Sequence, residues 1–166
     1  EYLPTAIIKG ECLQTRGKLH NASAMAGMAF SQAGLCLNHA IAHQQGGQFH
    51  IAHGLANSLL LTAVIQYNAR QDVRALKRYA RMAKACRFCA LEAEDQVALN
   101  QLLHHIRQLQ KQVGIATSLH ALNLGEAQVK ASLPAIIQAA QADGTMKTNP
   151  CPIADHDIAH IIEAIL

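Results

Sequence analysis

Residues 34–68 read GLCLNHAIAHQQGGQFHIAHGLANSLLLTAVIQYN and place four histidines directly before the most apolar part of the chain. Three of them, His39, His43 and His53, lie at spacings of four and ten. Because residues four apart share one face of a helix, His39 and His43 would project to the same side. Imidazole binds divalent transition metals and exchanges protons near neutral pH. The stretch therefore predicts a metal or proton-transfer site beside the core.

Two helices with a break between them are expected within this stretch. Asn38 can cap a helix that starts at His39 and stops at the glycine pair Gly46-Gly47. The connector Gln48–His53 then allows His53 to fold back towards the helix before it. Gly54–Tyr67 follows as a strongly apolar helix, whose wide apolar surface predicts deep burial.

The rest of the chain predicts an all-α fold, a multi-helix bundle over residues 1–166. Hydrophobic residues make up 51% of the chain and aromatic residues 4%, with Ala, Leu, Ile and Gln dominant, a mixture that favours helices. The small residues of one further helix predict close contact with neighbours and burial on most sides. The expected further helices are Pro4–Thr15, Leu19–Gly34 (the one rich in small residues), Asp72–Lys84, Glu94–Val113, Glu126–Ala142 and Asp155–Leu166.

Charge and cysteine content exclude several classes of function. The formal net charge is +3, and the basic residues within Arg70–Arg87 are spaced as one face of a solvated helix, without the aromatic platform of a nucleic-acid site. The apolar runs are too short to span a membrane. Five scattered cysteines fit a reducing cytosol better than a disulfide framework. Two of them, Cys86 and Cys89, form a CxxC that we interpret as small packing residues at a helix end.

The histidines leave more than one interpretation open. In a chain with ten histidines, a pair four residues apart also occurs by chance as a solvated or structural pair. Their apolar surroundings favour a functional role, because an unsatisfied imidazole there would be costly. One hypothesis is an independent all-α metal-binding protein with a closed site of His39, His43, His53 and His50. His50 otherwise fits the rim of the pocket.

The stretch resembles the signature of the iron-containing (group III) alcohol dehydrogenases. That signature runs Gly-Leu-x-x-x-His-x-x-x-His-x-x-Gly and later His-Gly-x-x-Asn, and the resemblance extends to HNASAMAGMAF before it, VIQYNA after it and TNP near the end. The segments LNHAIAHQ, GGQFH and RYARMAKAC are most similar in sequence to the alcohol dehydrogenases of bacterial ethanolamine utilisation. The resemblance implies a dehydroquinate synthase-like C-terminal helical domain.

The same resemblance implies a role for each matching residue. His39 and His53 correspond to metal ligands, with Fe²⁺ as the expected ion and Zn²⁺ as its alternative. His43 corresponds to the histidine near the nicotinamide and the substrate, so it is the expected catalytic and cofactor-binding residue. Phe30 and Thr145 correspond to residues of the substrate pocket.

The implied reaction is reversible hydride transfer between a small alcohol or aldehyde and NAD(H), with acetaldehyde and ethanol as the pair in ethanolamine catabolism. The family takes an Asp and a His from an N-terminal part as further ligands, and that part also carries the dinucleotide-binding domain. Neither occurs in residues 1–166. We therefore expect a missing N-terminal domain as partner, a cytoplasmic or microcompartment location, and homo-oligomers as an allowed assembly. The alternative is a catalytically incomplete helical fragment that acts as a structural or association module.

Three residues depart from the family pattern. Ala52 stands where proline is common, and we expect its loss to loosen the loop that places His53. Cys36 occupies a position often held by glycine, which puts a thiol near the site. Cys151 replaces a frequent arginine after Asn-Pro. None of these changes removes a residue of the histidine motif.

Overall fold

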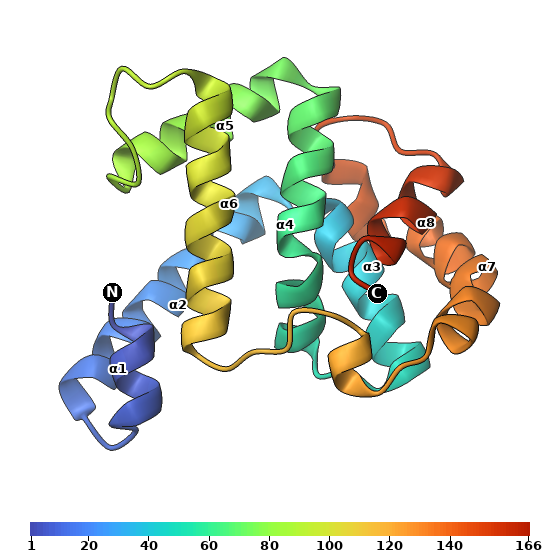
Figure 1. Ribbon diagram of the computed structural model, residues 1–166, viewed down its shortest axis with the longest axis horizontal. Helices are drawn as coiled ribbons and strands as arrows, with labels where there is room; N and C mark the ends of the chain where they lie inside the picture. Colours follow the sequence, from blue (N-terminus) through green and yellow to red (C-terminus); the bar gives the residue numbers. More distant parts are fainter.

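The computed structural model describes residues 1–166 and consists of eight α-helices and two 3-10 turns, without a β-strand (Figure 1). The prediction of an all-α bundle is therefore confirmed. No helix combines the length and the apolar character that crossing a membrane requires. The elements are α1 Leu3–Ile8, α2 Leu13–Ala33, α3 Cys36–Phe49, α4 His53–Gln71, α5 Val73–Ala85, α6 Asp95–Gln112, η1 His120–Leu122, α7 Glu126–Ala142, η2 Gly144–Thr148 and α8 Asp155–Glu163.

The two helices of the histidine stretch lie at the centre of the fold. Helices α3 and α4 pack against each other, with α5 and α6 on one side and α7 and α8 on the other (Figure 1). The main core joins Leu37 and Ile41 of α3 to Leu60 of α4, Ile136 of α7 and Ile158 of α8, and each of these side chains is fully buried. Burying an aliphatic side chain stabilises a fold by roughly 1.5–3 kcal/mol, so this core fixes the positions of α3 and α4.

Helix α3 runs through the glycine pair, so the predicted stop at Gly46-Gly47 is wrong. The helix begins at Cys36 and continues to Phe49, and the chain turns at His50, which has φ 55 and ψ 30 in the left-handed region. Each glycine weakens a helix by about 1 kcal/mol relative to alanine. Burial of one face of α3 against the core outweighs that loss.

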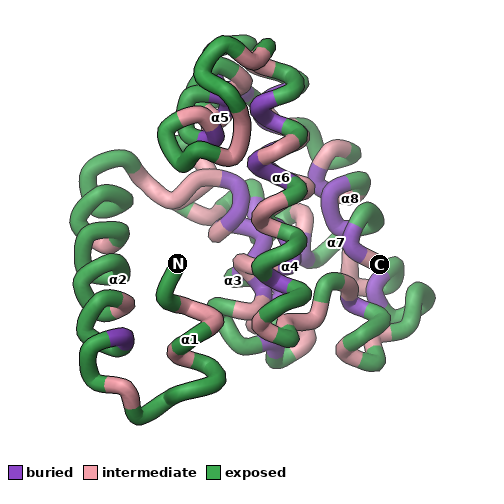
Figure 2. The backbone as a smooth tube through the Cα atoms, turned by 60° about the vertical axis from the view of Figure 1, so that its left-hand side comes forward, coloured by how far each residue is buried: buried purple, intermediate pink, exposed green.

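Helix α2 is exposed over nearly its whole length within residues 1–166. The prediction that the helix rich in small residues is buried on most sides is therefore wrong for this chain. Thr15 is its one buried residue, whereas Leu13, Met25 and Met28 are 84%, 66% and 64% exposed. In Figure 2 the helix stands apart from the body of the molecule together with α1. Small side chains allow two helices to approach closely, but their spacing in the sequence does not identify the neighbouring element that they contact.

The boundaries of the other helices are close to the predictions, apart from the N-terminal region. Helix α1 ends at Ile8 and α2 already begins at Leu13, so the predicted single helix over residues 4–15 is wrong. Asp72 caps α5 by accepting a 2.7 Å hydrogen bond from the Arg74 amide. The CxxC lies just beyond the end of α5, as expected, with Cys86 exposed and Cys89 half-buried.

Candidate metal centre

The fold brings the three histidines of the motif into one cluster. His39 and His43 lie one turn apart on α3, and His53 occupies the first position of α4. The ring centroids of His39 and His53 are 5.3 Å apart, those of His43 and His53 are 5.4 Å apart, and those of His39 and His43 are 5.9 Å apart. Only residues 50–52 separate the two helices, and this short turn sends His53 back to the face of α3, as predicted.

The position of His39 favours its neutral form. Partial burial lowers the pKa of His39, and the neighbouring rings of His53 and His43 lower it further, while the backbone of Leu35 opposes part of this shift. A metal binds the unprotonated imidazole nitrogen. His39 is therefore held in the protonation state that a ligand needs.

Two asparagines hold His53 at the start of α4. Asn57 lies one turn further along α4, and its amide nitrogen donates to the His53 carbonyl at 3.0 Å and lies 3.3 Å from His53 Nε2. Asn38 of α3 donates in turn to Asn57 Oδ1 at 2.7 Å. The chain of contacts fixes the first turn of α4 against α3 and leaves Nδ1 of His53 available.

His43 has a carboxylate partner from a distant part of the chain. Its Nδ1 lies 2.8 Å from Oδ2 of Asp143, across 100 residues of sequence. The other oxygen, Oδ1, accepts hydrogen bonds from the amide and the hydroxyl of Thr145 at 2.8 and 2.7 Å. Partial burial alone would raise the pKa of Asp143, but these hydrogen bonds outweigh it and lower the pKa.

A close approach of backbone to side chain joins the start of α3 to the turn that carries Asp143. Gly34 has φ +86, and a Cβ atom at this position would clash with the side chain of Thr148. The amide of Cys36 donates to Thr148 Oγ1 at 3.1 Å, and that hydroxyl donates to the Thr145 carbonyl at 3.0 Å. Glycine is thus required here for both conformation and space.

The predicted pocket residues lie beside this cluster. The ring centroid of Phe30, near the end of α2, is 6.5 Å from that of His39, and the Phe30 side chain is 45% exposed. Thr145 bonds to Asp143, the partner of His43. His50 ends α3 with an exposed ring and makes no ring contact with the other three. Asp143 and Asn57 were not predicted as site residues. Asn57 is the asparagine of the His-Gly-x-x-Asn motif, whereas no sequence motif points to Asp143.

The separation of His39 and His53 suits one shared metal ion. Two imidazoles that bind one tetrahedral ion at about 2.1 Å per bond have ring centres roughly 5 Å apart, close to the 5.3 Å found here. No group of three or more His, Cys, Asp or Glu side chains in residues 1–166 is arranged to hold an ion. The residues present therefore fit two ligands of a site, and they give no support to a closed site of His39, His43, His53 and His50.

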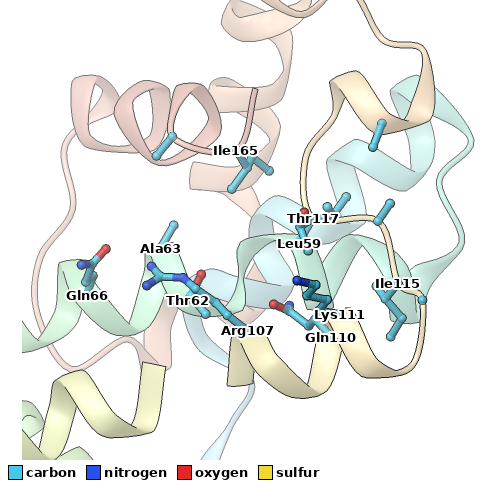
Figure 3. Close-up of a pocket in the computed structure, with 14 residues that line it drawn as sticks. Leu59, Thr62, Ala63, Gln66, Arg107, Gln110, Lys111, Ile115, Thr117 and Ile165 are labelled. Carbon is cyan, nitrogen blue, oxygen red and sulfur yellow. The ribbon is translucent and has the colours of Figure 1, made fainter. Parts of the chain in front are cut away.

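A cavity lined by other residues lies between α4, α6 and the C-terminal residues (Figure 3). Its volume is about 930 Å³, and its wall includes Leu59, Arg107 and Lys111. None of the three clustered histidines lines it. The proposed metal and proton-transfer residues therefore do not face this cavity.

Comparison with known proteins agrees with the motif. The model of the Fe-containing alcohol dehydrogenase family, C-terminal, matches residues 1–166. The chain is 55% identical over 166 residues to the 1-propanol dehydrogenase PduQ of Salmonella typhimurium, covering 100% of this chain and 45% of that protein. It is 38% identical over 148 residues to the probable alcohol dehydrogenase EutG of Escherichia coli, covering 89% of this chain and 34% of that protein.

A solved structure supports the same relationship. The crystal structure of a 1,3-propanediol oxidoreductase superposes with a TM-score of 0.89 at 30% identity, over 99% of this chain and 41% of that one. The chain spans less than half the length of these relatives. Together with the histidine motif, these matches show that the chain belongs to the Fe-containing alcohol dehydrogenase family and corresponds to its C-terminal part.

Proposed function

We propose that this chain is the metal-binding, substrate-facing part of a metal-dependent, NAD-linked alcohol dehydrogenase that interconverts a short primary alcohol and its aldehyde. The observation that carries the proposal is the pair His39 and His53, 5.3 Å apart between ring centres, with the His43–Asp143 pair beside it. The family assignment and the names of the relatives support the same reaction class.

Each residue of the site has a role in this proposal. His39 and His53 hold the ion, Fe²⁺ with Zn²⁺ as the alternative, and His43 exchanges the proton of the alcohol hydroxyl. Phe30 and Thr145 line the substrate pocket. When bound, the ion and the nicotinamide supply Lewis-acid and hydride-transfer chemistry.

The remaining ligands and the NAD site come, in this proposal, from the N-terminal part that the longer relatives possess. The exposed surface of α2 supports it. Large exposed apolar side chains on a helix that makes few contacts are typical of an interface. Met25 and Met28 are 66% and 64% exposed on α2, and Phe30, near the end of the same helix, lies next to His39. The alternative function is a structural module that only associates with another protein part. The exposed surface of α2 supports this alternative as well, whereas the histidine cluster has no role in it.

The substrate is a short aliphatic alcohol or aldehyde. The identity with a 1-propanol dehydrogenase is 55%, against 38% with the probable alcohol dehydrogenase EutG, so propanal and 1-propanol are the first pair to test and acetaldehyde and ethanol the second. One methylene changes discrimination by only about 1–3 kcal/mol, so both pairs are expected to react.

The experiment uses the full-length protein that contains this chain, loaded with Fe²⁺ or Zn²⁺. The wild-type protein is expected to bind about one ion per chain and to reduce propanal with NADH. His53→Ala is expected to lose most of the ion and the activity, because one ligand is removed. His50→Ala, an exposed histidine at the end of α3, is the matched control and keeps both. Full metal content and activity in His53→Ala would contradict the ligand assignment.

Activity without bound metal would contradict the metal dependence. Metal binding without turnover of any short aldehyde would favour the association module. Thermal melting with and without the ion gives an independent readout, because an ion that binds only the folded state raises the melting temperature.

A further inference from the structure

Asp143 is placed so that each of its oxygens has a separate task. Oδ1 accepts both hydrogen bonds from Thr145 and caps the turn η2, whereas Oδ2 faces Nδ1 of His43 at 2.8 Å. We propose that Asp143 is a positioning residue that fixes the tautomer and the ring orientation of His43. This inference rests on the proposed function, in which His43 exchanges the alcohol proton.

The tautomer follows from the chemistry of the carboxylate. An ionised carboxylate can only accept hydrogen bonds, so Nδ1 of His43 has to be the donor. A neutral imidazole has one N–H, and the second nitrogen, Nε2, is then left with a free lone pair. The contact with Asp143 therefore converts His43 into a base at Nε2.

Partial burial and the neighbouring rings leave Asp143 as the acceptor for Nδ1 of His43. The Asp143 side chain is 15% exposed and that of His43 is 38% exposed, so the contact is partly shielded from water. The rings of His39 and His53 are the other titratable groups beside His43, and neither of them can accept its Nδ1 proton in place of Asp143, whose Oδ2 already occupies that direction. Shielding strengthens an ionic hydrogen bond relative to the same bond in water.

The proton step can be written at named atoms. During alcohol oxidation the O–H bond of the substrate breaks and an N–H bond forms at Nε2, so His43 becomes an imidazolium. The negative charge of Asp143, 2.8 Å from Nδ1, stabilises that cation. In aldehyde reduction the same proton returns from Nε2 to the oxygen of the product.

Asp143→Asn tests the inference because the site dictates how the amide must lie. The two donors of Thr145 require an acceptor, so the amide oxygen takes the place of Oδ1. The amide nitrogen then faces His43 and donates to Nδ1, which forces the proton onto Nε2. His43 keeps its position but has the wrong tautomer for accepting a proton.

The expected loss is in kcat. A positioned general base contributes about 10²–10⁴-fold to a rate, so kcat of the full-length metal-loaded Asp143→Asn protein is expected to fall at least 100-fold, with KM for propanal changed less than threefold. Adding His43→Gln to Asp143→Asn is expected to cause little further loss, because both changes remove the same base.

Asp72→Asn is the matched control. Asp72 caps α5 by accepting a hydrogen bond from the Arg74 amide at 2.7 Å, as Asp143 caps η2. Its change to asparagine removes the same charge, but Asp72 has no histidine partner. Its kcat is expected to match wild type. Metal content and melting temperature are measured for both variants. A loss of metal or of folded protein that parallels the loss of kcat in Asp143→Asn would overturn the positioning role.

Nitrogen-15 NMR of the imidazoles in the zinc-loaded full-length protein gives a readout besides activity. The His43 signals are identified by their absence in His43→Gln. Wild type is expected to carry its proton on Nδ1 at neutral pH, and Asp143→Asn on Nε2. A wild-type His43 protonated at Nε2 would overturn the inference, even if the variant failed to fold. This readout also stands if the wild-type protein turns over no alcohol, so failure of the proposed function is recognised separately.

Discussion

The hydroxyl of Tyr67, near the end of α4, lies 3.0 Å from Oδ2 of Asp157 in the first turn of α8. The same hydroxyl lies 3.0 Å from the carbonyl oxygen of Pro152, and Asp157 also accepts the Ala154 amide at 3.0 Å. This contact joins the C-terminal helix to the helix that begins with His53. Burial and the hydrogen bond to Asp157 raise the pKa of Tyr67, so the hydroxyl stays a donor at neutral pH.

Tyr67→Phe is expected to lower the free energy of unfolding by about 1 kcal/mol at pH 7. The Ala154 amide and the Tyr67 hydroxyl lower the pKa of Asp157. A carboxylate with a depressed folded-state pKa stabilises the fold above its unfolded pKa of about 4, and this contribution disappears as the pH falls through the folded value. The penalty of Tyr67→Phe should therefore be smaller near pH 2 than at pH 7. Urea unfolding at both pH values measures it, with the exposed Tyr2→Phe as control; equal penalties would contradict the role of Asp157.

Ala52→Pro is expected to raise the free energy of unfolding by about 0.4–1 kcal/mol. Ala52 has φ −55 and ψ 135 just before His53, a backbone that proline adopts without strain. The turn thus keeps a proline-like conformation without proline, and the gain comes from restricting the unfolded chain. Thermal unfolding checks it. Ala52→Gly should shift stability in the opposite direction, and a destabilised Ala52→Pro would show that the Ala52 amide is needed.

Gln45→Met is expected to raise stability by about 1 kcal/mol or more. Gln45 of α3 is fully buried, and neither its amide nitrogen nor its amide oxygen has a hydrogen-bond partner. A buried unsatisfied polar group costs about 1–3 kcal/mol, and methionine has a similar shape without that cost. Chemical denaturation measures the change. The partly exposed neighbour Gln44, changed to Met, should stay within about 0.5 kcal/mol; a less stable Gln45→Met would mean that the amide is satisfied in solution.

Met28→Glu on α2 tests the proposed contact with the N-terminal part. Met28 is 64% exposed within residues 1–166, so the change should alter the stability of this chain alone by no more than about 0.5 kcal/mol. In the full-length protein the glutamate would be buried against the N-terminal part without its hydration, and the free energy of unfolding should fall by several kcal/mol. Thermal melts of both lengths make the comparison. Val97→Glu, at a residue 47% exposed on α6, should be neutral in both; equal behaviour of Met28→Glu in both would argue against an interface on α2.

Much of the candidate site follows from local spacing. His39 and His43 share a face of α3 because four residues make about one helical turn. The short turn after α3 was expected to return His53 to that face, and the ring distances confirm it. The family signature depends on these same spacings.

The partner of His43 could not be predicted from spacing. Asp143 is 100 residues away, in a turn where aspartate and glycine are common for local reasons. Only the packing of α7 and η2 against α3 places its carboxylate at Nδ1. The same holds for Gly34, whose need for space is visible only once Thr148 lies against it.

The amino-acid sequence alone determined the all-α class, because composition sets helix propensity, and the shared face of His39 and His43, because their spacing acts within a single turn. The resemblance of the histidine stretch to a known signature indicated the family. The tertiary structure decided where α3 ends, which surface of α2 stays exposed and which carboxylate lies beside His43. Those outcomes depend on burial and on contacts between distant segments. The histidine motif identifies the proposed ligands, but only packing brings the carboxylate of Asp143 to His43.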